Sequence, residues 1–212
     1  MKCVLCERRK GKRYCPAKST MICAQCCGEK RILEIDCPES CEYLQVGRAH
    51  EAALENERHL RTADPKKQQK RARIIDRFHG VIAHLEYVIG RERRSSRTFR
   101  DSDVAETLDL LLETYRTEDR GVLYEHTSNN LRVDSFRRQL KEIVESYRQP
   151  KERDREALRL RDTLECLELI RELVASHMET RESETSYVDF LARTMPRGQD
   201  LEGPGPSLIV PG

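Results

Sequence analysis

The chain has 212 residues, of which 36% are charged and 37% hydrophobic, with no Trp and a formal net charge of +2. It contains no apolar run of the length that a signal peptide or a membrane span requires, which argues against a secreted disulfide scaffold and against membrane partners. A chain of this composition can bury one modest core beside a metal-stabilised module. We therefore expect a mainly α-helical, cytoplasmic protein.

Eight of the nine cysteines lie within the first 41 residues, whereas Cys166 stands alone. Four of the eight form two Cys-x2-Cys pairs, and this spacing lets both thiolates of a pair reach one tetrahedral ion. In a reducing compartment this pattern favours zinc over an iron–sulfur cluster and over redox-active thiols or disulfides. The predicted metal ligands are Cys3, Cys6, Cys15, Cys23, Cys26, Cys27, Cys37 and Cys41.

Eight thiolates suffice for two zinc ions, and two pairings remain open. In an interleaved arrangement, which we favour because each Cys-x2-Cys pair stays on one ion, the first ion binds Cys3, Cys6, Cys23 and Cys26 and the second binds Cys15, Cys27, Cys37 and Cys41. Neighbouring side chains at positions 26 and 27 would then point to different ions. In a sequential arrangement the first ion instead binds Cys3, Cys6, Cys15 and Cys23.

The last two cysteines flank a predicted helix start. Pro38 suits the first position of a helix and Glu39 suits the positive end of its dipole, so Cys37 is expected at the cap and Cys41 one turn later. Thiolates at a helix N-terminus have a lowered pKa, which favours metal binding.

Three segments of this module carry a resemblance: Cys3-Val-Leu-Cys6, Arg13-Tyr-Cys-Pro16 and Ile22-Cys-Ala-Gln-Cys26. They resemble the HIT-type and MYND-type zinc fingers, which are small cross-brace modules that bind two zinc ions and mostly serve as protein-interaction platforms. The HIT pattern has a further cysteine where this chain has Ala17 and Lys18. The whole chain also looks like an uncharacterised bacterial group of cysteine-headed helical proteins, which implies no function.

Apolar residues recur at helical spacing from residue 42 to about 193. A weakly apolar helix (Leu44, Ala49, Ala52, Ala53, Leu60) is expected to end near Thr62. Asp64 and Pro65 open a second helix with the stripe Ile74 to Ile89, and Asp101 or Ser102 caps a third with the stripe Val104 to Tyr115. Gly121 and residues 127–130 break the chain. Further helices are expected over Val133–Tyr147, Asp154–Met178 and Tyr187–Leu191.

Helices with one apolar stripe each must pool their stripes to be stable, which predicts an α-helical bundle. The stripes also allow an oligomeric coiled coil, although the chain breaks interrupt any long heptad register. We expect a zinc-binding module over residues 1–45, a bundle over 46–195 and a disordered tail over 196–212.

Charge is divided unevenly along the chain. Residues 1–100 hold 23 Lys and Arg against 13 Asp and Glu, a net +10, whereas residues 101–212 hold 16 against 24, a net −8. The basic residues cluster at 8–13, 66–73 and 91–100. Such clusters fit the phosphates of a nucleic acid, an acidic partner or the acidic half of a second copy, and they also occur on ordinary solvated helices.

Signals of catalysis are weak. Asp76 and His79 have the spacing of one half of a di-iron site, but the second half is missing, and no phosphate-binding loop or nucleophile elbow occurs. Cys166 is interpreted as a buried small hydrophobic residue. The sequence thus predicts a non-enzymatic zinc-binding adaptor or regulator that acts through a protein partner, with DNA or RNA binding by the basic half as the alternative.

Overall fold

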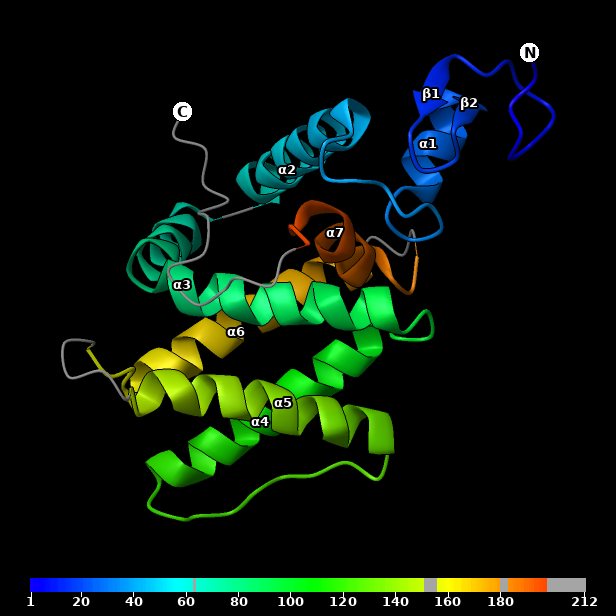
Figure 1. Ribbon diagram of the computed structural model, residues 1–212. Coiled ribbons are helices and arrows are strands. Elements are labelled where there is room, and N and C mark those ends of the chain that lie inside the picture. Colours follow the sequence, from blue (N-terminus) through cyan, green and yellow to red (C-terminus); the bar gives the residue numbers. More distant parts are fainter. Residues whose placement is uncertain (63, 151–155, 180–182, 198–212) are drawn as a thin grey trace.

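The computed structural model describes residues 1–62, 64–150, 156–179 and 183–197. A small N-terminal module is joined by one helix to a larger helical bundle (Figure 1), so the predicted fold class, mainly α with a cysteine-rich module followed by a bundle, is confirmed. The described elements are β1 (Arg13–Cys15), β2 (Thr20–Ile22), α1 (Ala24–Lys30), α2 (Glu42–Thr62), α3 (Pro65–Ser95), α4 (Asp101–Asp119), α5 (Leu131–Arg148), α6 (Leu160–Glu179) and α7 (Ser186–Thr194).

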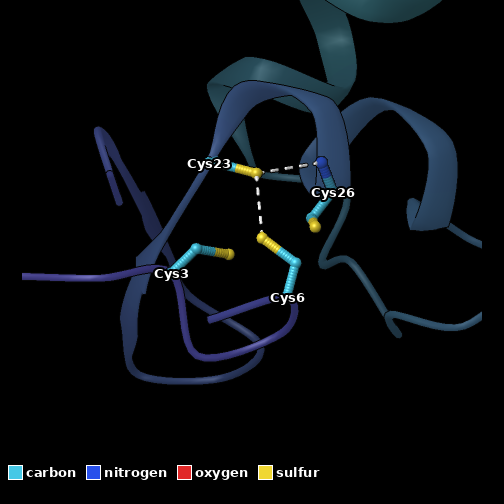
Figure 2. A group of neighbouring side chains, drawn as sticks. All are labelled: Cys3, Cys6, Cys23 and Cys26. Atoms are coloured by element: carbon cyan, nitrogen blue, oxygen red, sulfur yellow. Dashed lines mark hydrogen bonds between the residues drawn. The ribbon is translucent and has the colours of Figure 1, made fainter. Parts of the chain in front are cut away.

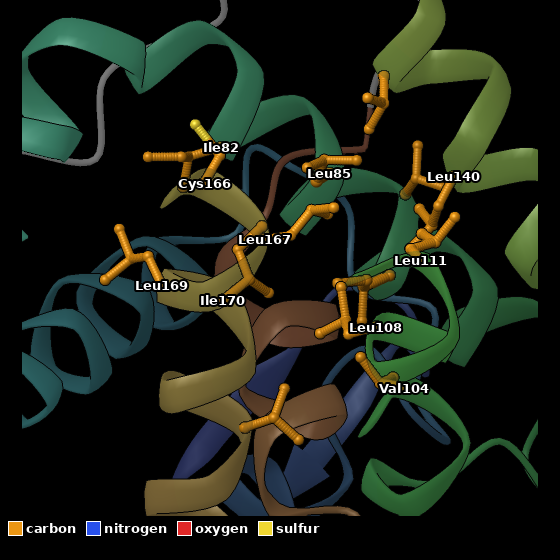
Figure 3. Close-up of a cluster of buried hydrophobic side chains, with 14 of the residues drawn as sticks. Ile82, Leu85, Val104, Leu108, Leu111, Leu140, Cys166, Leu167, Leu169 and Ile170 are labelled. Carbon is orange, nitrogen blue, oxygen red and sulfur yellow. The ribbon is translucent and has the colours of Figure 1, made fainter. Parts of the chain in front are cut away.

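The bundle is formed by α3 to α7, whose apolar stripes meet in one core (Figure 3). Helix α4 packs against α5 and α6, and Leu108 and Leu111 on this helix are fully buried. The stripes predicted from the sequence therefore pack against one another within a single chain, as an intramolecular bundle requires.

Local capping explains where several helices begin. The side chain of Asp64 accepts a hydrogen bond from the backbone N–H of Lys66, and Pro65 occupies the first helical position of α3, as predicted. Asn130 caps α5 in the same way by accepting from the N–H of Arg132. These side chains satisfy backbone donors that have no partner inside the helix.

Three predicted helix starts are wrong. The residue at the cap of α4 is Arg100, whose backbone N–H donates to the carboxylate of Asp103, so neither Asp101 nor Ser102 has this role. Helix α6 begins at Leu160, six residues after the predicted position, because residues 156–159 are not helical. No helix begins at Pro38: residues 38–41 form a turn closed by the N–H of Cys41 on the carbonyl of Pro38, and α2 begins at Glu42.

Helix α2 faces the bundle with polar side chains. Ala49 and Ala53, two residues of its predicted stripe, are exposed. The side chains that meet the bundle are instead Arg48, Glu51 and Glu55, which bond to α6, to α7 and to the residues just after α7. The predicted stripe of α2 is thus wrong at Ala49 and Ala53, whereas its first residue, Leu44, is buried in the core of the N-terminal module.

The N-terminal module has its own small core, in which the cysteines surround Ile22, Ile35 and Leu44. Its hairpin pairs β1 with β2 in antiparallel register, and neither this hairpin nor α1 was expected from the sequence. Gly11 lies so close to the hairpin that an added Cβ would be 2.8 Å from the carbonyl oxygen of Met21. A side chain at position 11 is therefore excluded.

Two domain boundaries were predicted, one after residue 45 and one after residue 195. The first lies within a continuous helix, and most of the tail beyond the second lies outside the described residues. Helix α2 runs without interruption through residue 45. Of the predicted tail, Pro196 and Arg197 are described, and residues 198–212 lie outside the described residues. Among the described helices, none combines the length and the apolar character needed to cross a bilayer.

Candidate metal centre

Four cysteines meet at one point of the N-terminal module. Cys3 and Cys6 come from the loop before β1, whereas Cys23 and Cys26 come from the start of α1 (Figure 2). Their four Sγ atoms lie within 4.8 Å of one another, and the Sγ atoms of Cys6 and Cys23 are 3.9 Å apart. Tetrahedral ligands about 2.3 Å from a zinc ion are separated by roughly 3.8 Å, so this group has the dimensions of a zinc site.

Backbone hydrogen bonds hold both cysteine pairs in place. The N–H of Cys3 donates to the carbonyl of Arg9, and the N–H of Glu7 donates to the carbonyl of Cys3, each at 2.8 Å, which closes the loop around the first pair. Cys23 is the N-cap of α1, and its sulfur accepts from the N–H of Cys26 at 3.4 Å. The hydrogen bond fixes the position of the Cys23 sulfur relative to the first turn of α1.

Burial and backbone hydrogen bonds shift the pKa values of Cys3, Cys6 and Cys26 in different directions. Burial opposes ionisation of Cys3, but backbone N–H groups of Cys23, Leu5 and Cys6 outweigh it and lower the pKa of Cys3 to about 6. Burial and the neighbouring sulfurs raise the pKa of Cys26 to about 12. One member of the group thus ionises readily and another only with difficulty, and a divalent cation would remove this conflict by compensating the accumulated negative charge.

Arg9 supplies positive charge beside the cluster. Its backbone N–H, followed by that of Arg8, lowers the pKa of Cys6. The thiolate of Cys23 in turn raises the pKa of the Arg9 guanidinium through a hydrogen bond. Four thiolates around a divalent ion carry a net charge of about −2, which a guanidinium at this position partly offsets.

The remaining four cysteines of the module are all buried but form no second group of this kind in the described part of the chain. Cys15 ends β1, Cys27 lies on α1, and Cys37 and Cys41 flank the turn before α2. All four line one small cavity with Ile22, Ile35, Pro38 and Tyr43. Burial, followed by the nearby sulfurs of Cys41, Cys15 and Cys27, raises the pKa of Cys37.

Cys26 and Cys27 are neighbours on α1, yet one contributes to the four-sulfur cluster and the other to the small cavity. Adjacent residues of an α-helix point about 100° apart, which separates their sulfurs. The four-sulfur cluster is the set that the interleaved arrangement assigns to the first ion. Cys15, which the sequential arrangement would place on that ion, is not part of it.

Arginines from the bundle hold the loop that precedes α2. Arg97 donates to the carbonyl of Leu33 at 3.3 Å, and Arg197 donates to the carbonyl of Cys37 at 3.3 Å and pairs with Asp36. From the module side, Arg48 pairs with Glu39 and donates to the backbone carbonyls of residues 193 and 195. These contacts join residues up to 161 positions apart, and nothing in the spacing of the sequence signals them.

The other predicted sites have ordinary surroundings. Asp76 and His79 are both exposed, and the His79 ring lies 3.4 Å from the backbone carbonyl of Asp76. Cys166 is fully buried in the bundle core, and burial raises its pKa to about 12, in agreement with a structural thiol.

The four-cysteine cluster identifies the N-terminus as a zinc-finger-like module. Comparison with protein-family models, with curated proteins and with solved structures finds no match to this chain. No match therefore bears on the HIT-type or MYND-type character of the module, and the geometry of the site is the basis for the function proposed below.

Proposed function

We propose that the protein is a non-enzymatic adaptor or regulator of the cytoplasm that acts through protein contacts and depends on zinc for the structure of its N-terminal module. The observation that carries this proposal is the cluster of Cys3, Cys6, Cys23 and Cys26. Four thiolates complete the coordination of a zinc ion and leave no open position for a substrate, which is the mark of a structural site.

A second zinc ion belongs to the same proposal, with Cys15, Cys27, Cys37 and Cys41 as its ligands. Three features support it: all four side chains are buried, they line one cavity, and the other three sulfurs act on the pKa of Cys37. The ion would draw the four sulfurs together and so fasten the turn before α2 to the hairpin.

Elemental analysis of purified protein tests both ions. We expect about two zinc per chain, about one in Cys26→Ser and about one in Cys41→Ser, because a site that loses one of four ligands binds zinc far more weakly. Cys166→Ser is the matched control and keeps two. A wild-type value of one would refute the second site, and a value near zero, or iron in place of zinc, would refute the zinc-dependent module itself.

A protein-contact role is favoured by an apolar segment between α4 and α5. Leu123 is 89% exposed, its neighbours Val122 and Tyr124 are more than half exposed, and Leu131 at the start of α5 is 82% exposed. Four large apolar side chains exposed within ten residues are unusual on a surface that contacts only water. This segment, residues 122–124 with Leu131, is our candidate partner-binding surface.

Affinity capture tests the adaptor role directly. Tagged wild-type protein, Leu123→Asp and the control Val46→Asp, whose side chain is also exposed, would be compared after nuclease treatment. We expect specific protein partners with the wild type and with the control, and their loss with Leu123→Asp at unchanged zinc content. Equal capture by all three proteins would contradict a role for the segment.

Nucleic-acid binding remains the alternative function, and the structure narrows the region on which it would rest. Arg93, Arg94 and Arg97 of the third basic cluster are engaged in hydrogen bonds within the chain. The first cluster, residues 8–13, is different, because Arg8, Lys10 and Lys12 are exposed. The surrounding residues 1–23 hold seven Lys and Arg and one acidic residue in all. A steep loss of affinity for DNA or RNA with rising salt would support this alternative over the adaptor.

A further inference from the structure

Four polar side chains from four helices meet where α2 rests on the bundle. The Nε2 atom of His177 on α6 lies 3.0 Å from a carboxylate oxygen of Glu55 on α2. The hydroxyl of Tyr187 on α7 lies 3.3 Å from a carboxylate oxygen of Glu86 on α3. The rings of His177 and Tyr187 are in edge contact, with centroids 5.2 Å apart, so the two hydrogen-bonded pairs form one cluster.

Three of the four side chains are largely shielded from water, and the fourth, Glu86, is half-buried. His177 and Tyr187 are 2% and 1% exposed, and the side chain of Glu55 is 11% exposed. Burial of a carboxyl group disfavours its charged form, and a second carboxylate nearby adds to this effect. Burial, with a further contribution from Glu55, raises the pKa of Glu86 to about 7, and the hydrogen bond from Tyr187 only partly opposes this.

Other polar groups around the cluster have defined partners of their own. The hydroxyl of Ser186 on α7 lies 3.1 Å from the Nδ1 atom of His177. Asp101, at the start of α4, contributes to the raised pKa of Tyr187 and accepts hydrogen bonds from the N–H groups of Tyr187 and Val188. Asp189 is paired with Arg93.

We propose that Glu55, Glu86, His177 and Tyr187 form a proton-dependent latch that holds the second half of α2 against the bundle. Helix α2 contributes no residue to the bundle core among its described side chains, so polar contacts dominate its attachment. Of these, Arg48 and Glu51 secure the first half of the helix, and Glu55 reaches the bundle from the second half. This inference is independent of metal binding.

The direction of the effect follows from the state in which Glu86 holds its proton. In the latched state Glu86 keeps the proton up to about pH 7, whereas a solvated Glu loses it near pH 4.5. Between these values the latched state binds more protons, so each rise of one pH unit weakens the latch by up to about tenfold. Above pH 7 the carboxyl group of Glu86 is charged in both states, so the latch reaches its weakest level.

Hydrogen–deuterium exchange of the full-length protein measures how strongly the second half of α2 is held against the bundle. Exchange of peptides from α2, corrected for the intrinsic effect of pH, is followed from pH 5 to 8 in the wild type, in Glu86→Gln and in Glu142→Gln, an exposed control on α5. We expect protection of the second half of α2 to fall by more than tenfold up to pH 7 and then to level off. Glu86→Gln should abolish this dependence and raise protection at pH 8, and Glu142→Gln should leave it unchanged.

Two results would overturn the latch. One is that the exchange rate of α2 peptides still depends on pH in Glu86→Gln. The other is a loss of protection that spreads equally over α4 and α5, because Glu86 would then report the stability of the whole bundle. We expect neither variant to change the zinc content, because Glu86 and Glu142 lie outside the module, so failure of the latch is distinguishable from failure of the zinc proposal.

Discussion

Asp101 connects the start of one helix to the start of another. It is 1% exposed, and its two carboxylate oxygens accept hydrogen bonds from the backbone N–H groups of Tyr187 and Val188, at 3.1 and 3.0 Å. These donors belong to the first turn of α7, where no partner exists within the helix. A carboxylate from α4 thus caps a helix that follows it by more than 80 residues.

Removal of this cap should destabilise the folded protein. We expect Asp101→Ala to lower the free energy of unfolding by about 2–4 kcal/mol, because two buried donors lose a charged acceptor. Urea denaturation followed by circular dichroism measures the change. Asp109→Ala on the same helix, which removes an exposed ion pair with Arg171, should cost less than about 1 kcal/mol. Equal costs for the two variants would show that Asp101 does not stabilise α7.

Cys166 differs from the module cysteines in reactivity. Cys166 lies in the apolar core of the bundle, where burial raises its pKa to about 12, and we expect it to stay buried when zinc removal loosens the module and exposes the thiols there, Cys26 included. Alkylation by iodoacetamide after zinc removal should modify the eight module cysteines and leave Cys166 unmodified until the bundle is unfolded. Peptide mass spectrometry identifies the sites, and early modification of Cys166 would contradict its place in the bundle core.

At the scale of elements, α3 and α7 pack closely because of a glycine. A Cβ added at Gly90 would lie 3.0 Å from the backbone carbon and oxygen of Leu191, whereas one added at Gly80 would have no atom within 4 Å. The same helix therefore offers a crowded glycine and an open one.

Substitution by Ala should change the free energy of unfolding in opposite directions at these two glycines. Gly90→Ala is expected to lower the free energy of unfolding by about 1–2 kcal/mol, because the clash with a backbone outweighs the better helix propensity. Gly80→Ala should raise it by up to about 1 kcal/mol. Thermal and urea unfolding measure both variants, and stabilisation by Gly90→Ala would mean that α7 is not held at this distance.

For helix α2, apolar periodicity predicted the end of the helix but not the face that packs against the bundle. Its end was predicted well, since it ends at Thr62 as expected. Its inner face was not, because Arg48, Glu51 and Glu55 are charged, and charged residues are expected on the solvent side of a helix. Long-range partners such as Arg193 and His177 determine which face is inner, and no local pattern contains them.

At the scale of the whole molecule, two separate cores exist. The module core consists of cysteines with a few aliphatic residues, and the bundle core draws on α3 to α7 and the segments that join them. No described residue belongs to both cores. Loss of the metal should therefore affect the first core and spare most of the second.

Chelation tests this separation. We expect removal of zinc from the full-length protein to reduce the helical circular dichroism signal by less than about one third, because α3 to α7 keep their apolar core. The exposure of module thiols to a chromogenic reagent verifies that zinc has left. Loss of nearly all helical signal would refute the independence of the bundle.

The bundle and the first cysteine cluster were predictable because both rest on local spacing: apolar residues three and four apart, and cysteine pairs two residues apart. The cap of α7 by Asp101 and the latch around Glu86 were not, because each joins residues that are about 90 to 120 positions apart and have no distinctive type. The start of α2 was misplaced since Pro38 fits a turn as well as a first helical position.

The arginine contacts between the module and the end of α7 bear on the order of assembly during synthesis. The module lies within the first 41 residues, whereas Arg197, which donates to the carbonyl of Cys37, is translated some 150 residues later. At ordinary rates of elongation this interval lasts about 10 to 30 seconds. The nascent module can thus acquire its ion before its docking partner has left the ribosome, and the joint between the two ends of the chain closes as a late event of folding.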